Sequence, residues 1–349
     1  MSQNKRQNEK YENMGLTGLA NLGNTCFLNS CIQCLSHTYE FSEFLDKKKY
    51  MEHIRKEIDT LILIEWDKLR KLMWSENCVI RPSGFVKKVQ EVAKVKDRVV
   101  FTGYAQNDLE EFLTFLIECF HNALFREFEM NILGDVKTKQ DKLAVKCYDM
   151  IKTIYKKEYS EIIDLFYGIH VSKLSTVSNS YQNIIPEPFC IVSLPIPNIA
   201  KPSILDCFNL YTKKEKLEGD NAIYIEKTKQ KENATRQLLF WNLPKILICT
   251  LKRFSNNSRK NQKYVDFNLD DLDLSDYVLG YDNNSYKYEL YGICNHQGSC
   301  LGGHYTAFVK NANGKWYFFN DTNVMEVKDN NKLKTPKAYC FFYRKKKIQ

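Results

Sequence analysis

The sequence lacks long apolar runs. None approaches the roughly eighteen uninterrupted apolar residues that a membrane-spanning helix requires. The N-terminal segment MSQNKRQNEKYEN is polar throughout and is unlike a secretory signal, so a cytosolic or nuclear location and no contact with a membrane are expected. With 44% hydrophobic residues, the 349-residue chain can nevertheless bury a large core, in one large domain or two smaller ones.

The sequence also lacks a motif in which aromatic residues are interleaved among arginines, as in many proteins that bind nucleic acids. Lys and Arg total 51 against 42 Asp and Glu, which gives a formal charge of +9. The clearest basic runs, at residues 47–49 and 344–347, favour a solvated surface over a nucleic-acid patch. No nucleic-acid partner is therefore expected.

The twelve cysteines do not form the compact framework of loops that is typical of disulfide-rich domains. They are scattered among apolar runs, as Cys119 and Cys249 are, and so indicate small buried side chains in a reducing compartment. One CxxC pair occurs, at Cys31 and Cys34, without a second Cys or His pair nearby at metal-ligand spacing. Core packing is favoured over zinc for this pair, and no metal or other cofactor is expected.

The apolar pattern changes once along the chain. Residues 1–14 lack apolar periodicity and predict a disordered tail. The first half is otherwise mainly helical, and after Gly168 the pattern changes to short alternating or apolar runs separated by Asn, Asp, Gly and Pro. This order predicts an α+β fold with helices first and strands second, in one domain at residues 15–346.

Cys26 is the best candidate for a nucleophile. It lies where the loop GLTGLANLGNT changes to a helical pattern, and the unpaired N–H groups and dipole of a helix N-terminus favour a thiolate. Among the six histidines, His304 is the best base, because Gly302 and Gly303 allow the backbone to approach a ligand closely and an apolar strand follows. By residue type alone, packing at Cys26 and a simple turn before His304 stay open as alternatives.

The strand pattern KWYFF, which follows the strand of His304, ends in Asn320 and Asp321. A hairpin that pairs the two strands would bring a side-chain carbonyl to the far nitrogen of the imidazole. A Cys-His pair uses such a third residue to orient the histidine.

The segments around these residues resemble those of a known family. GLANLGNTCFLNSCIQCLSH is similar to the Cys box of the ubiquitin-specific proteases, and YGICNHQGSCLGGHYTAFVKNANGKWYFFNDTNV is similar to their His box. Between them, AQNDLEEFLTFLIE, EPFCIVSLPIP and LPKILICTLKRFS resemble further segments of the same family, in the family's order. The resemblance spans residues 15–343.

This resemblance implies a papain-like cysteine protease fold with a helical thumb, a β-rich palm and fingers that cradle ubiquitin. It implies Cys26 as the nucleophile, His304 as the base, Asn320 as the third member of the triad, and Asn21 as the side chain of the oxyanion hole. Asp321 would help to polarise the histidine or bind near the oxyanion. Alternatively, Asp321 is only a turn residue after a strand.

The implied activity is thiol-dependent deubiquitination by a monomer, with ubiquitin and ubiquitinated proteins as partners. The Cys26 thiolate would attack the carbonyl of the last glycine of ubiquitin, and Asn21 with the Cys26 backbone N–H would stabilise the oxyanion. Water would then hydrolyse the thioester. Two alternatives stay open: a ubiquitin-binding scaffold without turnover, and a protease for another ubiquitin-like modifier.

Other positions are implied near the tail of ubiquitin. Asp108 would accept a hydrogen bond from an arginine of that tail, or it would merely cap the helix that it opens. Gly302 and Gly303 would lie against the substrate. His296 matches a family position near the entrance to the site, and a structural role is favoured for it.

The fingers depart from the family pattern. Many relatives hold a structural zinc there with two CxxC pairs, whereas the corresponding positions here are Thr176, Asn179, Ile225 and Thr228. Structural zinc requires Cys or His at all four positions. The fingers are therefore expected to be held by strand pairing and apolar packing alone, with a more mobile tip.

Overall fold

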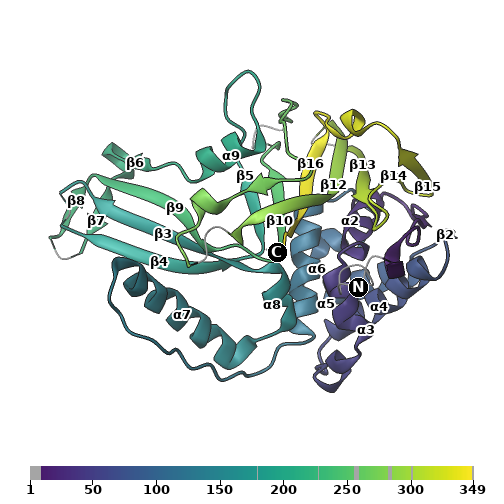
Figure 1. The fold of residues 1–349 in the computed structure, drawn as a ribbon, viewed down its shortest axis with the longest axis horizontal. Coiled ribbons are helices and arrows are strands. Elements are labelled where there is room, and N and C mark those ends of the chain that lie inside the picture. Colours follow the sequence, from purple (N-terminus) through teal and green to yellow (C-terminus); the bar gives the residue numbers. More distant parts are fainter. Residues whose placement is uncertain are drawn as a thin grey trace.

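A computed structural model describes residues 9–178, 180–226, 228–254, 259–281, 285–299 and 302–347. It confirms the predicted α+β arrangement: a helical thumb, a β-rich palm and a smaller finger sheet lie side by side along the longest axis of the molecule (Figure 1). Within the described residues, no helix is long and apolar enough to cross a membrane.

The thumb is built from helices that pack on one another and on the palm. Helix α6 is typical, because its apolar residues recur on one buried face and Asp108 caps its N-terminus by accepting hydrogen bonds from two backbone N–H groups. The thumb elements are α2 (Cys26–Ser36), α3 (Tyr39–Asp46), α4 (Thr60–Ser75), α5 (Ser83–Val95) and α6 (Leu109–Asn122), with the 3-10 helices η1 (Lys49–Glu52) and η2 (Val99–Phe101) and the short strands β1 (Gly18–Leu19) and β2 (Val79–Ile80).

The palm is an eight-stranded sheet with the order β15-β14-β13-β12-β16-β10-β5, and β11 pairs with β12 beside this path. Strand β10 reads ILICTL and is buried along its whole length, as expected for a central strand covered on both faces. The palm strands are β5 (Ile191–Leu194), β10 (Ile246–Leu251), β11 (Leu272–Asp273), β12 (Lys287–Ser299), β13 (Gly302–Lys310), β14 (Trp316–Asn320), β15 (Asn323–Val327) and β16 (Ala338–Lys345).

The fingers form a separate four-stranded sheet with the order β4-β3-β9-β6, and a β7–β8 hairpin lies near its far end. Helix α7 packs on this sheet through a small apolar cluster that includes Cys147, Val171 and Trp241. Helix α8 (Glu161–Phe166) packs in the core between thumb and palm, and α9 (Ile204–Tyr211) packs in the palm core. The finger elements are α7 (Lys139–Glu158), β3 (Gly168–Thr176), β4 (Gln182–Phe189), β6 (Glu215–Leu217), β7 (Ile223–Ile225), β8 (Gln230–Glu232) and β9 (Ala234–Asn242).

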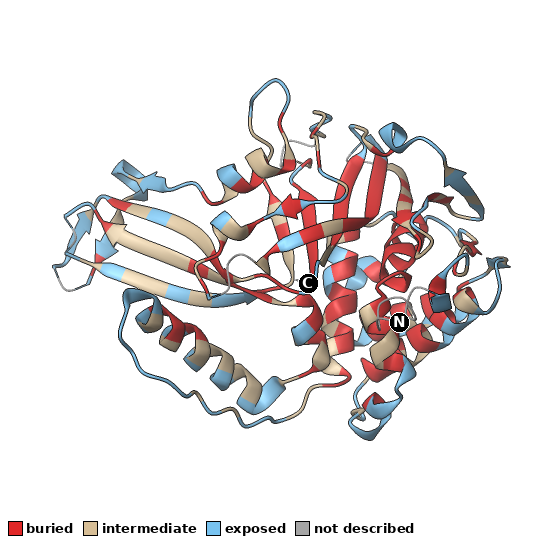
Figure 2. Ribbon diagram, in the orientation of Figure 1, coloured by how far each residue is buried: buried red, intermediate tan, exposed pale blue. Residues whose placement is uncertain are grey.

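Two large apolar clusters form the core where the thumb meets the palm and within the palm. Figure 2 shows that buried residues concentrate in α2, α6 and the central palm strands, whereas the finger sheet is mostly half-buried or exposed. Cys31 and Cys34 are fully buried in the first cluster, and the Cys34 Sγ lies 3.6 Å from the Cys294 Sγ of β12. These positions agree with core packing as the role of the CxxC pair.

The start of the chain differs from expectation. Residues 1–8 of the predicted disordered tail lie outside the described residues, but Tyr11 is only 3% exposed and stacks on Tyr39 with ring centroids 4.4 Å apart. The Asn311 side chain also donates to the Met14 carbonyl at 2.8 Å. The prediction of a disordered tail is therefore wrong for residues 9–14, because one aromatic ring that packs at long range leaves no periodic pattern in the sequence.

Candidate active site

Cys26 is the first residue of α2, as predicted, and its side chain is buried. The loop before it turns sharply through Gly23 and Asn24, whose φ values are 98° and 55°. Asn21 stabilises this turn, since its Oδ1 accepts hydrogen bonds from the backbone N–H groups of Gly23 and Thr25, both at 3.1 Å. The turn thus aims the unpaired N–H groups of the helix start at the Cys26 thiol.

Two opposing effects act on the Cys26 thiol. Burial raises its pKa, and the negative charge of Asp321 acts in the same direction. Backbone hydrogen bonds, the strongest from Tyr305 and others from Phe27 and Cys26 itself at the helix start, lower the pKa, but they do not outweigh burial. The net effect is a raised pKa, so the helix start alone does not favour the thiolate as the sequence predicted. A base is needed.

His304 and Asn320 lie in the predicted hairpin, where β13 pairs with β14. The His304 Nε2 and the Asn320 Oδ1 are 2.6 Å apart. Because an amide oxygen only accepts, Nε2 must donate, which leaves Nδ1 as the proton-accepting nitrogen. His304 is adjacent to Tyr305, whose backbone lies close enough to the Cys26 thiol to lower its pKa, so Cys26 lies near the His304–Asn320 pair.

Asp321 joins the palm to the loop before α2. It follows β14 with a φ of 49°, which agrees with a turn residue, and its Oδ2 accepts a hydrogen bond from the Asn21 Nδ2 at 3.0 Å. Its Oδ1 accepts from the Asn29 Nδ2 at 2.8 Å. Sequence reasoning missed Asn29, although a polar residue within the apolar pattern of α2 was a possible sign of a buried polar contact.

Asp108 has both carboxylate oxygens engaged. Its Oδ1 accepts from the N–H groups of Glu110 and Glu111 at 2.9 and 3.2 Å, so the helix-cap interpretation describes one real contact. Its Oδ2 accepts from the Tyr339 hydroxyl at 2.8 Å. The carboxylate also lies at the edge of an acidic pocket.

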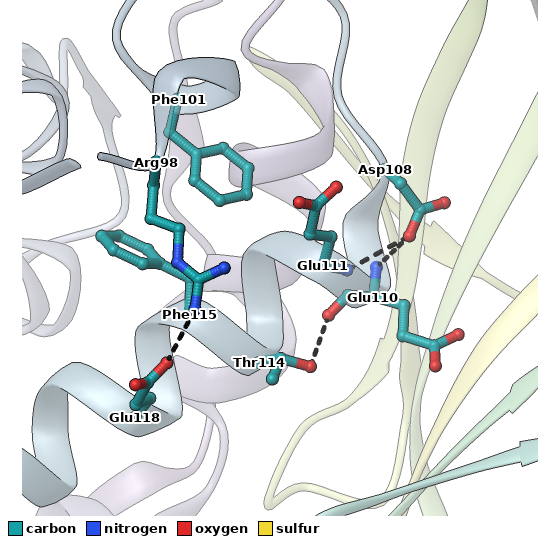
Figure 3. A pocket seen from close by; sticks show the side chains of 8 residues that line it. All are labelled: Arg98, Phe101, Asp108, Glu110, Glu111, Thr114, Phe115 and Glu118. Carbon is teal, nitrogen blue, oxygen red and sulfur yellow. Dashed lines mark hydrogen bonds and ion pairs between the residues drawn. The ribbon is translucent and has the colours of Figure 1, made fainter. Parts of the chain in front are cut away.

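That pocket has a volume of about 270 Å³ and lies along the exposed side of α6 (Figure 3). Burial raises the pKa of Glu110, whose carboxylate accepts from the Thr250 hydroxyl at 2.6 Å. Arg98 is the one basic residue among those that line the pocket, and its guanidinium nitrogen Nη2 lies 3.8 Å from the Glu118 Oε2. The lining residues are Arg98, Phe101, Asp108, Glu110, Glu111, Thr114, Phe115 and Glu118.

Gly303 lies between the side chains of Gln106 and His296. Its N–H donates to the Gln106 Oε1 at 2.8 Å, and its carbonyl accepts from the Gln106 Nε2 at 2.9 Å. A Cβ at this position would lie 2.3 Å from the His296 Nε2, so only glycine fits. Gly302 lies beside it, where a Cβ would meet the Gln106 Oε1 at 3.0 Å. Gln106 lies in the motif AQNDLEEFLTFLIE, but no role was predicted for it from the sequence.

His296 is a packing residue in this structure. Its ring is 4.6 Å from the Tyr305 ring and 5.2 Å from the Phe254 ring, measured between centroids. Burial lowers its pKa to about 4, so the imidazole is neutral at physiological pH. This environment agrees with the structural role that the sequence favoured.

The fingertip has a polar network at the positions where relatives hold zinc. The hydroxyls of Ser178 and Ser180 donate to the Glu232 carboxylate at 2.7 and 2.9 Å. The expectation that strand pairing and apolar packing alone hold the fingers is therefore wrong, because this network also joins two turns. Thr176 and Thr228 lie beside it, Ile225 is in β7, and Asn179 lies outside the described residues. Within the described residues, no group of three potential ligands could hold a metal.

Comparison with known proteins identifies the family. The model of the family described as ubiquitin carboxyl-terminal hydrolase matches residues 17–343. The chain belongs to the ubiquitin-specific proteases. Human ubiquitin carboxyl-terminal hydrolase 2 is 34% identical over 348 residues, which cover 94% of this chain and 55% of that protein. Human ubiquitin carboxyl-terminal hydrolase 21 is 33% identical over 358 residues, which cover 95% and 61%.

Solved structures show the same fold. The yeast SAGA DUB module with an Sgf73 mutant matches with a TM-score of 0.71 at 26% identity, covering 96% of this chain and 69% of that chain. The SAGA DUB module bound to monoubiquitin matches with a TM-score of 0.73 at 24% identity, covering 96% and 70%. The papain-like protease fold that the motifs implied is thus confirmed. This ubiquitin-specific protease chain spans little more than half the length of the curated relatives that it matches.

Proposed function

We propose that this chain is a thiol-dependent deubiquitinase that hydrolyses the bond after the C-terminal glycine of ubiquitin. The observation that carries the proposal is the 2.6 Å hydrogen bond between His304 and Asn320 beside a cysteine at a helix start. An intact orienting contact of this kind favours turnover over a scaffold that only binds ubiquitin. The matched relatives are named as ubiquitin carboxyl-terminal hydrolases, which also supports the reaction type.

In the proposed mechanism, the Cys26 proton moves to the Nδ1 of His304 as the thiolate attacks the glycine carbonyl. The attack forms a C–S bond, and collapse of the tetrahedral intermediate breaks the C–N bond as the imidazolium protonates the leaving amine. Water then attacks the thioester with His304 as its base, which releases ubiquitin and restores the thiol. The neutral hydrogen bond to Asn320 keeps the proton on Nε2, so that Nδ1 can accept the Cys26 proton as these reaction steps require.

The oxyanion would be stabilised by the Cys26 backbone N–H and by the side-chain amide of Asn21. Asn21 is well suited to this role. The backbone N–H groups of Gly23 and Thr25, in the turn between Asn21 and Cys26, fix its side-chain oxygen, and the Asp321 carboxylate accepts one of its two amide hydrogens. Within the described residues, the Asn21 Nδ2 makes no other hydrogen bond, so its second hydrogen would meet the developing charge. Loss of one such donor typically slows catalysis by about 10² to 10³.

The proposed partners are ubiquitin and ubiquitinated proteins, which a monomer would process in the cytoplasm or nucleus. The acidic pocket beside Asp108 supports a substrate tail that contains arginine, because carboxylates along a partly desolvated channel take charge-assisted hydrogen bonds from guanidinium groups. Another ubiquitin-like modifier with a similar tail would be cleaved by the same chemistry.

The decisive experiment is reaction of the purified chain with ubiquitin that carries a C-terminal electrophile. We expect one adduct by intact mass, mapped to Cys26 by peptide analysis, and no adduct with Cys26→Ala. Cys78→Ala is the matched control, because Cys78 is a partly exposed cysteine outside the site and its loss should leave the adduct unchanged. An adduct that persists in Cys26→Ala would show that the nucleophile is wrongly assigned.

A further inference from the structure

The part of β13 nearest to the active site has an open edge. Strand β12 pairs with β13 from Gly302 onward, whereas the pairing of β14 with β13 begins only at Ala307. Within the described residues, no strand covers the other edge of residues 302–306. The main-chain groups on such an edge are a template for an extended peptide.

The side chain of Gln106 occupies this edge. Its Oε1 accepts from the Gly303 N–H at 2.8 Å and its Nε2 donates to the Gly303 carbonyl at 2.9 Å. A primary amide offers one carbonyl and N–H donors, which are the groups that a peptide unit would present to the same strand. The carboxamide is therefore a substitute for the main chain of a bound peptide.

The occupied position lies directly beside the chemistry. In an extended strand, the carbonyl of Gly303 and the N–H of Tyr305 point to the same edge. The Tyr305 backbone lies close enough to the Cys26 thiol to lower the pKa of that thiol. A peptide that pairs with Gly303 would thus have its next carbonyl directed toward Cys26.

Gly303 cannot move aside to free this edge. The His296 ring lies against it so closely that a Cβ would be 2.3 Å from the His296 Nε2, and His296 is itself only 4% exposed. Gln106, in contrast, is an exposed residue of the segment between η2 and α6, and its side chain has no other hydrogen bond within the described residues. The movable partner is therefore Gln106.

We propose that Gln106 is a gate: its carboxamide occupies the main-chain docking site for the substrate residue that precedes the cleaved bond, and it must swing away before a tail can bind. The ligand class is an extended peptide with small residues at its end. This inference rests on the proposed function. Because two neutral hydrogen bonds in an exposed position are individually weak, the gate should reduce affinity by about tenfold without blocking turnover.

Steady-state kinetics on ubiquitin with a C-terminal fluorophore test the gate. Gln106→Ala should lower KM by about tenfold with kcat unchanged. The mutation removes only the conformation of the free enzyme in which the Gln106 carboxamide occupies the docking site. Gln90→Ala is the matched control: the Gln90 Nε2 donates to the Gly103 carbonyl of the same segment at 3.2 Å but does not contact β13. Its KM should equal that of the wild type, and both variants should melt as the wild type does.

The same comparison in a Cys26→Ala background measures the dissociation constant of unmodified ubiquitin without catalysis. Gln106→Ala should tighten binding by the same factor. An unchanged or larger dissociation constant, a higher KM or a lower kcat in Gln106→Ala would overturn the gate, because Gln106 would then hold the substrate or the base. Absence of cleavage by the wild-type chain would instead contradict the proposed function, and the binding comparison would still report on the gate.

Discussion

At the scale of single residues, the proposed mechanism assigns proton transfer to a buried thiol and a half-buried imidazole. Burial raises the pKa of the Cys26 thiol, so the mechanism needs His304 as a base. Asn320 holds His304 through a 2.6 Å hydrogen bond and takes no part in bond formation. These unequal roles predict unequal effects of mutation.

Cys26→Ala is expected to abolish release of a fluorophore from the C-terminus of ubiquitin while ubiquitin binding persists. Asn320→Ala should lower kcat by about 10²-fold and leave measurable activity, because His304 remains but is no longer oriented. Release assays and binding by calorimetry measure the two effects. Wild-type turnover by Cys26→Ala, or complete inactivity of a folded Asn320→Ala, would contradict the assigned roles.

The pH dependence of Cys26 alkylation tests its electrostatic environment. The thiolate is the reactive form, so a raised pKa means that the rate of iodoacetamide alkylation should still increase at pH values where an ordinary cysteine is fully reactive. Asp321→Asn removes a negative charge that raises this pKa, and the profile should therefore shift to lower pH. The site of alkylation is confirmed by peptide mass. A shift to higher pH in Asp321→Asn would count against this account.

At the scale of elements, helix termini and a strand edge place the groups that are proposed to meet the substrate. Helix α2 presents Cys26, and helix α6 presents Asp108 and the acidic side chains of its first turn. The open edge of β13 presents Gly303 and Tyr305. Each candidate position thus lies at a helix start or on a strand edge, where main-chain groups are not paired within the element itself.

Asp108 caps α6 and is proposed to bind the substrate tail as well, and Asp108→Asn distinguishes the observed role from the proposed one. Asparagine caps helices about as well as aspartate, so this variant should melt within a few degrees of the wild type, whereas Asp108→Ala should lose about 1 kcal/mol of stability. If the carboxylate binds an arginine of the tail, Asp108→Asn should raise KM by roughly tenfold. Ubiquitin with neutralised tail arginines should then lose little further affinity for the variant. An unchanged KM in Asp108→Asn would show that Asp108 is only a cap.

The fingertip depends on Glu232, and its loss should loosen only the β7–β8 hairpin. Hydrogen bonds from Ser178 and Ser180 hold the pKa of Glu232 below its ordinary value. Its stabilising effect is therefore present above the ordinary glutamate pKa and is lost as the pH falls through the lowered value. Hydrogen exchange should be faster in residues 223–232 of Glu232→Ala, and Glu226→Ala is the matched control. Equal exchange in both variants would mean that the network does not order the tip.

At the scale of the whole molecule, contacts between residues far apart in the chain join the thumb to the palm. These contacts are Asn21 with Asp321, Gln106 with Gly303, and Asp108 with Tyr339. Because each contact joins the helical half to the strand half, the candidate site is complete only when the entire domain has folded. The N-terminal residues contribute to the same assembly through Tyr11.

A chain that begins at residue 15 should be less stable than one that begins at residue 9. Tyr11 is buried and stacked on Tyr39, and loss of such an aromatic side chain typically costs about 3 kcal/mol or more. Tyr11→Ala should reproduce most of the loss in melting temperature, whereas Glu12→Ala, at the exposed neighbouring position, should not. Equal melting temperatures for the two chain lengths would show that residues 9–14 do not stabilise the fold, as the prediction of a disordered tail implied.

The sequence by itself determined the elements whose pattern is local. The start of α2 at Cys26, the change from helices to strands at Gly168, and the hairpin that joins His304 to Asn320 all follow from periodicity and turn residues within short windows. The same segments resemble family motifs. These features could be predicted because main-chain hydrogen bonding and side-chain spacing within an element depend on neighbouring residues.

Only the tertiary structure decided which side chains meet between thumb and palm. Asn29 binds Asp321, Gln106 binds Gly303, and Tyr11 is buried, although the surrounding residues do not identify the partner of any of these side chains. Likewise, the raised pKa of Cys26 is a result of burial, which exists only after the palm has closed over the helix start. Such contacts and pKa shifts arise because segments that are remote in the chain pack together, and a local sequence pattern does not predict them.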